Sequence, residues 1–268
     1  MMRANQPIGI FDSGIGGLTV ANAISRTLPN EQIIYFGDTA HLPYGEKSHD
    51  AIRYYCLKIV KFLLEKKCKM IVVACNSAAT AAYDVLLEFF DQHALFVNVV
   101  DPLVNEVVAK KFNKVGIIAT KATISSGIYE KKLQEKQPTL QVATMATPLL
   151  APMIEEGFVH NKISLAVLEN YFTKPIFNDI EALLLACTHY PLIRTDIAAC
   201  FTTDIQLFDS TFSVAEAVRQ KLSSNGLLNQ QTTPPAHNFY VSDYTPSFEE
   251  STQLFYGASV SLEANNIW

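Results

Sequence analysis

The sequence has 268 residues, of which 49% are apolar and 18% charged, a composition typical of globular proteins and not of disordered chains. The formal net charge is −5 and no basic run is present, so the charge pattern of a nucleic-acid binder is missing. No apolar run approaches the roughly 18 residues of a membrane span, and residues 1–17 do not resemble a signal peptide. We therefore expect a cytoplasmic chain with reduced thiols and no membrane or nucleic-acid partner.

Apolar strand-like runs alternate with helix-like segments along most of the chain. The first half predicts strands at 8–11, 33–36, 70–74 and 95–100, with helices between them. The second half predicts strands at 115–119, 140–145, 182–186 and 205–208, again separated by helices. Continuous apolar strands that alternate with amphipathic helices favour parallel sheets covered on both faces. The predicted fold class is therefore α/β.

The chain also contains an internal pseudo-repeat. Residues 8–13 resemble residues 115–120, and residues 72–77 resemble residues 184–189, in the same order. This pattern predicts two pseudo-symmetric lobes with parallel-rich sheets and an active site in the cleft between them.

The region after the second lobe predicts a return to the first. Residues 223–238 have the composition of a surface loop, and a short strand at 239–241 and a helix at 247–256 follow. This tail is too small to be a domain, so we expect it to complete the first lobe. The expected lobes are 1–98 plus 212–268, and 99–211.

The ends of the predicted strands are the first place to look for a site, because ligands of open parallel sheets bind beyond the carboxyl ends of the strands. The residues at these ends are nearly all polar: Asp12-Ser13, Gly37-Asp38, Cys75-Asn76-Ser77, Thr120 and Cys187-Thr188-His189.

Two of the five cysteines stand out. The chain has no CxxC pair, and Cys56, Cys68 and Cys200 are interpreted as small buried hydrophobes. Cys75 and Cys187 occupy equivalent positions in the pseudo-repeat, each before a predicted helix start, where the helix dipole is expected to lower a thiol's pKa. Two thiols facing each other across a cleft suit the inversion of a stereocentre, which needs a base on one face and an acid on the other.

Neighbouring groups point to a small acidic ligand. Asp12 and His189 could move protons or tune the thiols, although a helix N-cap and a structural histidine are the alternatives. Neutral donors also lie at the strand ends: Asn76, Ser77, Thr120, Thr123 and Thr188. The loop that contains Pro43, Tyr44 and Gly45 could close over a ligand. These groups suit a small zwitterionic acid.

Cofactors and metals are not expected. The turn at residues 13–17 does not complete GxGxxG, because Thr19 occupies the third glycine position. The six histidines lack metal-ligand spacing, and Lys121 is the one lysine near these strand ends that could form a Schiff base with pyridoxal phosphate.

Six segments between residues 11 and 193 together resemble glutamate racemase. They read, in order, FDSGIGGLTV, YFGDTAHLPYGEKS, VVACNSA, TKATI, TPLLAPMIEEG and LLACTHYPLI. The resemblance implies a cofactor-independent, cytoplasmic and homodimeric enzyme that interconverts L- and D-glutamate and supplies D-glutamate for peptidoglycan. Ser77 and His41 depart from the usual pattern, in which Thr and Arg are frequent.

The resemblance also implies roles for individual residues. Cys75 would remove the α-proton of D-glutamate and Cys187 would act on L-glutamate, assisted by Asp12, Glu155 and His189. Residues that would bind or line the substrate are Ser13, Pro43, Tyr44, Gly45, Asn76, Ser77, Thr120, Thr123, Thr188 and His189. The adjacent Glu156 leaves a one-residue ambiguity in the assisting carboxylate.

Two alternatives stay open on the sequence alone. An aspartate racemase or a related cysteine-pair isomerase would share both thiols. A non-catalytic amino-acid-binding protein could also use the same fold.

Overall fold

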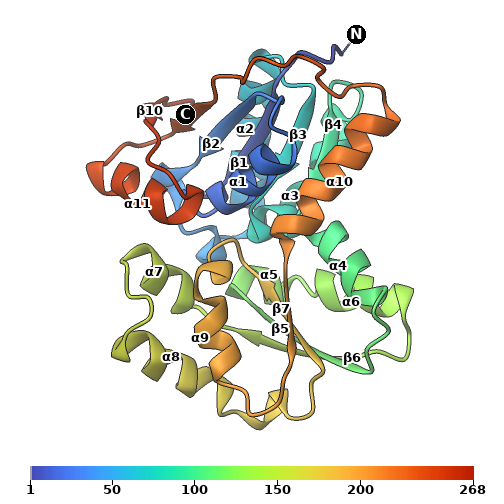
Figure 1. Ribbon diagram of the computed structural model, residues 1–268, viewed down its shortest axis with the longest axis vertical. Helices are drawn as coiled ribbons and strands as arrows, with labels where there is room; N and C mark the ends of the chain where they lie inside the picture. The colour runs from blue at the N-terminus through green and yellow to red at the C-terminus, as the bar shows by residue number, and fades with distance from the viewer. Residues whose placement is uncertain (1) are drawn as a thin grey trace.

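Two parallel sheets form the cores of two lobes, which lie one above the other in Figure 1. The structure is a computed structural model and describes residues 2–268. The first sheet has the strand order β10-β9-β2-β1-β3-β4, and the second has the order β6-β5-β7-β8. All strand pairs are parallel, and the predicted α/β fold is confirmed.

The first sheet consists of β1 (Ile8–Asp12), β2 (Ile33–Gly37), β3 (Met70–Val73), β4 (Leu95–Asn98), β9 (Asn238–Val241) and β10 (Glu263–Ala264). Its helices are α1 (Leu18–Thr27), α2 (His49–Glu65), α3 (Asn76–Phe90), α10 (Ser210–Ser224) and α11 (Pro246–Tyr256). Helix α1 packs against α10 and α11, whereas α2 packs against α3. Every residue of β1, β2 and β3 is buried, which explains why these strands read as unbroken apolar runs.

The second sheet consists of β5 (Lys114–Ala119), β6 (Gln141–Ala146), β7 (Ala182–Ala186) and β8 (Gln206–Asp209). The helices of this part of the chain are α4 (Val100–Val108), α5 (Lys121–Ser125), α6 (Ile128–Lys136), α7 (Leu150–Glu155), α8 (Lys162–Phe172) and α9 (Arg194–Ala199). Short 3-10 helices are η1 (Thr39–His41), η2 (Tyr44–Glu46), η3 (Pro175–Phe177) and η4 (Tyr190–Ile193).

The pseudo-repeat corresponds to equivalent positions in the two sheets. The order β2-β1-β3-β4 in the first sheet has the same topology as β6-β5-β7-β8 in the second. Strand β3, which precedes Cys75, therefore lies where β7, which precedes Cys187, lies in the other lobe. The two thiols consequently follow the carboxyl ends of equivalent strands, one in each sheet.

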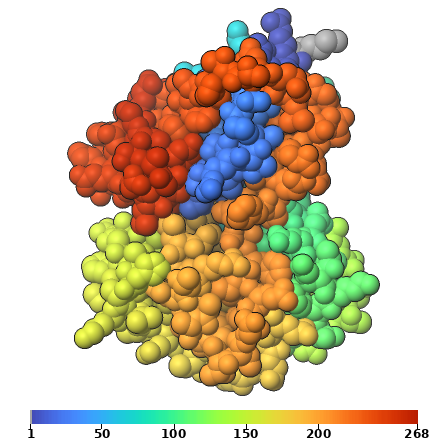
Figure 2. Space-filling model, viewed as in Figure 1, coloured from blue at the N-terminus to red at the C-terminus, as the bar shows by residue number. Residues whose placement is uncertain are grey.

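The tail of the chain returns to the first sheet, where β9 pairs with β2 and Phe239 lies opposite Tyr35. Figure 2 shows this red C-terminal segment beside the blue surface of the N-terminal region, with the green and yellow residues of the second lobe below. The strands pair within two separate sheets, which is compatible with the expected lobes 1–98 plus 212–268, and 99–211, while the exact bounds stay a prediction.

Candidate active site

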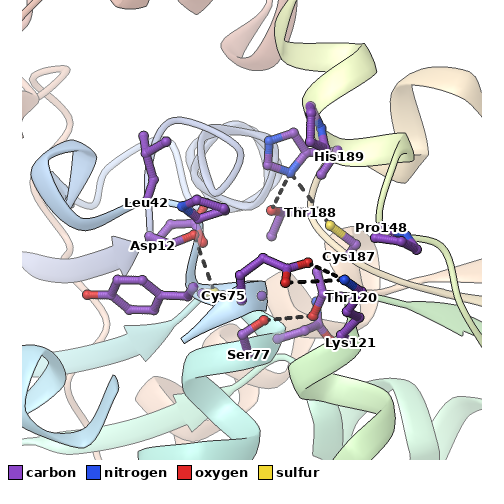
Figure 3. A pocket seen from close by; sticks show the side chains of 18 of the residues that line it. Asp12, Leu42, Cys75, Ser77, Thr120, Lys121, Pro148, Cys187, Thr188 and His189 are labelled. Atoms are coloured by element: carbon purple, nitrogen blue, oxygen red, sulfur yellow. Dashed lines mark hydrogen bonds and ion pairs between the residues drawn. The ribbon is translucent and has the colours of Figure 1, made fainter. Parts of the chain in front are cut away.

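A cavity of about 250 Å³ lies where the strand ends of the two sheets meet. Its wall contains nearly all the predicted site residues: Asp12, Ser13, Pro43, Tyr44, Gly45, Cys75, Asn76, Ser77, Thr120, Glu155, Cys187, Thr188 and His189. The cavity suits a small metabolite, because pockets for drug-sized ligands are commonly 300–1,000 Å³. Figure 3 shows that Cys75 and Cys187 approach this space from different segments of the chain.

Cys75 lies at the N-cap position of α3, two residues after the end of the buried strand β3. Its Sγ donates a hydrogen bond to Ser13 Oγ at 3.6 Å, and the residue is only 6% exposed. Burial and the nearby Asp12 carboxylate raise the pKa of Cys75 well above its ordinary value, and hydrogen bonds from Ala78 and Ser13 offset this only in part. The expectation that the helix start lowers this pKa was wrong, because desolvation and a like charge outweigh the dipole.

Cys187 has a different environment. It precedes the 3-10 helix η4 and not an α-helix, so the expected α-helix start is missing at this thiol. The Sγ of Cys187 lies 3.6 Å from Nδ1 of His189, and His189 Nε2 lies 2.8 Å from Glu155 Oε1. Burial alone would lower the pKa of His189, but Cys187 and Glu155 together raise it well above its ordinary value. The ring therefore favours its charged form and presents Nδ1 as a hydrogen-bond donor to the Cys187 sulfur.

Asp12 and Asn76 each present an unpaired polar atom. Asp12 accepts the Gly17 N–H at 2.5 Å through Oδ2, whereas its buried Oδ1 has no hydrogen-bond partner within residues 2–268. The buried Nδ2 of Asn76 has none within the same residues. Buried polar groups are rarely left unpaired, so an acceptor and a donor on one cavity wall suit the ammonium and carboxylate groups of an amino acid.

The loop that carries Pro43, Tyr44 and Gly45 is anchored from behind by Asp38. Tyr44 Oη donates to Asp38 Oδ2 at 2.6 Å, and Ser242 Oγ donates to Oδ1 at 2.8 Å. His41 Nδ1 lies 2.9 Å from Asp38 Oδ1. Since Asp38 is fully buried, it fixes the position of Tyr44 on the cavity wall.

Thr123 is the one predicted site residue that does not line the cavity. It lies one helical turn beyond Thr120, which is the N-cap of α5 and accepts the Thr123 N–H at 3.3 Å. The Thr123 hydroxyl instead belongs to a cluster of three hydroxyl groups, 3.1 Å from Thr120 Oγ1 and 3.5 Å from Ser77 Oγ.

Several cavity residues were not predicted as binding residues: Leu42, Glu46, Lys121, Thr147, Pro148, Ala151 and Pro152. Thr147 directly follows β6, so the strand-end rule would have found it. Lys121 and Glu46 form an ion pair at 3.2 Å that joins the two lobes at the cavity. No local sequence pattern predicts such a pair, because its partners come from different lobes.

Neither a cluster of metal-binding side chains nor a membrane-spanning helix is present among residues 2–268. In this part of the chain, no group of three His, Cys, Asp or Glu side chains is arranged to hold a metal ion. No helix there is long and apolar enough to cross a membrane.

The family of the chain follows from sequence comparison. A family model described as Asp/Glu/Hydantoin racemase matches residues 9–218, so the chain belongs to this racemase family. A relative named glutamate racemase from Chlorobaculum tepidum is 39% identical over 263 residues, covering 97% of this chain and 95% of the relative. The resemblance to glutamate racemase carried by the six segments is thereby confirmed.

Solved structures agree with the sequence comparison. Glutamate racemase from Francisella tularensis, in complex with D-glutamate, has a TM-score of 0.92 and 37% identity, with 98% of each chain covered. The enzyme from Thermus thermophilus, in complex with β-chloro-D-alanine, has a TM-score of 0.88 and 36% identity, also with 98% of each chain covered. An aspartate racemase homologue from Pyrococcus horikoshii shares the fold at a TM-score of 0.53 and 16% identity, covering 81% of this chain and 99% of that chain.

Proposed function

We propose that the chain interconverts L- and D-glutamate by proton transfer between Cys75 and Cys187, without a cofactor. The observation that carries this proposal is that both thiols line one cavity at equivalent strand ends of two repeated sheets. Relatives named glutamate racemase, matched over nearly their whole length, support glutamate as the substrate. The weaker likeness to an aspartate racemase homologue supports the fold alone.

The environments of the two thiols suggest a resting charge state. The raised pKa of Cys75 favours its thiol, and the raised pKa of His189 favours an imidazolium 3.6 Å from the Cys187 sulfur. In the direction from L- to D-glutamate, Cys187 acts as the base that takes the α-proton, and the Cys75 S–H delivers a proton to the opposite face. The product is D-glutamate, and the reverse reaction exchanges the roles of the two sulfurs.

The remaining polar groups would orient the substrate. Asp12 Oδ1 is suited to accept a hydrogen bond from the ammonium group, and a cation there would reduce the repulsion between Asp12 and a Cys75 thiolate. Asn76 Nδ2 is suited to donate to a carboxylate oxygen, whose negative charge grows as the α-proton leaves. Ser13, Ser77, Thr120, Thr188 and the 43–45 loop would complete the binding site.

The cellular role is a proposal of the same kind. We propose that the enzyme supplies D-glutamate for peptidoglycan and acts in the cytoplasm as a homodimer. These points rest on the resemblance to glutamate racemase, and the net charge of −5 argues against a nucleic-acid partner. Light scattering coupled to gel filtration tests the dimer, and a mass of one chain would contradict it.

Proton exchange tests the reaction itself. The purified chain is incubated in D₂O with L-glutamate, D-glutamate or either enantiomer of aspartate, and α-deuteration is followed by NMR and inversion by polarimetry. Glutamate is expected to exchange and invert much faster than aspartate. Faster exchange of aspartate would overturn the substrate, and glutamate binding without any exchange would favour the non-catalytic alternative.

A further inference from the structure

The side-chain amide of Asn76 is held by a residue from the other lobe. Asn76 is the first residue of α3 in the first lobe, and Tyr129 belongs to α6 in the second. Tyr129 Oη donates a hydrogen bond to Asn76 Oδ1 at 2.5 Å, and both residues are 3% exposed. The contact is therefore buried at the junction of the lobes, behind the cavity wall that Asn76 forms.

We propose that Tyr129 is a positioning residue, which fixes the Asn76 amide so that its Nδ2 faces the substrate carboxylate. This inference rests on the proposed function and extends it to a residue that does not line the cavity. Tyr129 acts only through Asn76, and no proton of the racemisation passes through its hydroxyl.

The hydrogen-bond inventory of an amide gives the reason. When Oδ1 accepts from Tyr129, the N–H groups of Nδ2 are left for a partner in the cavity, and Nδ2 is indeed buried without one within residues 2–268. The opposite orientation would turn Oδ1 toward the cavity, where it would repel a carboxylate. Burial raises the pKa of Tyr129 well above its ordinary value, so the phenol keeps its proton and remains a donor.

The arrangement makes substrate recognition depend on the contact between lobes. A second contact, partly buried, joins the same two parts of the chain, because Ser77 Oγ lies 2.9 Å from Thr120 Oγ1. The start of α3, which follows Cys75, is thus tied to the second lobe at two successive residues. The Asn76 donor is correctly aimed only when both lobes are in the juxtaposition seen in Figure 1.

Steady-state kinetics of Tyr129→Phe and Asn76→Ala, alone and combined, test the proposal. Tyr129→Phe is expected to lower kcat/KM for glutamate about tenfold, the size of effect that loss of one buried hydrogen bond produces. The double variant should be no slower than Asn76→Ala, since Tyr129 has nothing left to position. Parental kcat/KM in Tyr129→Phe, or additive losses in the double variant, would overturn the proposal.

Tyr240→Phe is the matched control. Tyr240 is also a buried residue, but its hydroxyl lies in the first lobe, 3.5 Å from Lys66 Nζ, and the residue does not line the cavity. Removing this hydroxyl should leave kcat/KM within about twofold of the parent value. A tenfold loss in the control as well would show that any lost buried phenol slows the enzyme, which contradicts a specific role for Tyr129.

Asn76→Asp tests the amide orientation with the phenol in place. Aspartate still accepts the Tyr129 hydrogen bond but presents a carboxylate oxygen to the substrate, so kcat/KM should fall at least as far as in Asn76→Ala. Retained activity would mean that an oxygen atom serves in the cavity, which overturns the proposed orientation even if Tyr129→Phe does not fold. A parent enzyme that does not racemise glutamate would instead overturn the proposed function.

Discussion

His189 Nε2 lies 2.8 Å from Oε1 of Glu155, while the opposite ring nitrogen faces Cys187 at 3.6 Å. The carboxylate and the sulfur thus bracket one imidazole ring. Figure 3 shows the ring above Cys187 and Thr188, with its bonds to both drawn. Because both neighbours raise the pKa of the ring, the charge of His189 depends on Glu155.

Replacing Glu155 with Gln should shift the pH dependence of racemisation. The Glu155 carboxylate raises the pKa of His189, so its removal lowers that pKa, and the imidazolium is lost at a lower pH than in the parent. The alkaline limb of kcat/KM should therefore move toward acidic pH. Profiles of kcat/KM against pH for both proteins measure the shift.

The neighbouring glutamate provides the control for this experiment. Glu156 is exposed and follows the end of α7, so Glu156→Gln should leave the alkaline limb in place. The pair of variants also resolves which carboxylate assists, a question that the sequence leaves open. An unmoved limb in Glu155→Gln, or an equal shift in Glu156→Gln, would contradict the assignment.

Single thiol variants should separate proton exchange from inversion. Cys187→Ser and Cys75→Ser should each lower racemisation about 10²–10⁴-fold, because one of the two acid–base groups is lost. Cys187→Ser should still exchange the α-proton of D-glutamate with D₂O, since Cys75 can remove and return it on one face. Cys75→Ser should correspondingly exchange L-glutamate, and NMR distinguishes the two cases.

If Cys187→Ser exchanged the α-proton of L-glutamate and Cys75→Ser that of D-glutamate, the roles assigned to the two sulfurs would be reversed. Inversion at the parent rate in either variant would remove the two-thiol mechanism altogether. Cys56→Ser serves as the control, because Cys56 is buried and does not line the cavity.

Two glycines of one turn should differ sharply in their tolerance of alanine. A Cβ on Gly16 would lie 2.3 Å from Cε1 of His189 and 2.6 Å from Oγ1 of Thr188, so these side chains would have to move. A Cβ on Gly14 would meet only Leu42, at an ordinary contact distance of 3.6 Å. Since a displacement of about 1 Å can cost about 10²-fold in rate, Gly16→Ala should lose most activity and Gly14→Ala little. Racemisation assays of both variants, with thermal unfolding as a check of folding, would contradict this if the losses were equal.

The sequence predicted which strand-end residues line the cavity better than it predicted their pKa values. Polar strand ends identified Asp12, Cys75 and Cys187, because parallel strands bring their carboxyl ends to one edge whatever the details of packing. The raised pKa of Cys75 escaped prediction, since it depends on burial and on how closely Asp12 approaches in space.

Contacts between lobes were equally hidden. Tyr129 lies 53 residues from Asn76, and Lys121 lies 75 residues from Glu46, so no local pattern links either pair. Both pairs depend on how the two sheets and their helices lie relative to each other. Thr123 was predicted from its place near a strand end, but its position one helical turn after an N-cap brings its hydroxyl to those of Thr120 and Ser77 and not to the cavity wall.

A buried ion pair far from the cavity should govern stability without governing chemistry. Lys69 Nζ lies 2.6 Å from Glu31 Oε2 and also donates to the carbonyls of Ala4 and Leu227, with both ionic side chains almost fully buried. Lys69→Met leaves the Glu31 charge buried and unpaired, which should lower the free energy of unfolding by about 3–5 kcal/mol. The combined Lys69→Met and Glu31→Leu variant removes both charges and should recover most of that loss. Urea denaturation measures each value, and kcat/KM of the folded variants should stay near that of the parent because neither residue lines the cavity. A double variant as unstable as Lys69→Met would show that the carbonyl contacts of Lys69, and not its charge pairing, hold this part of the first lobe together.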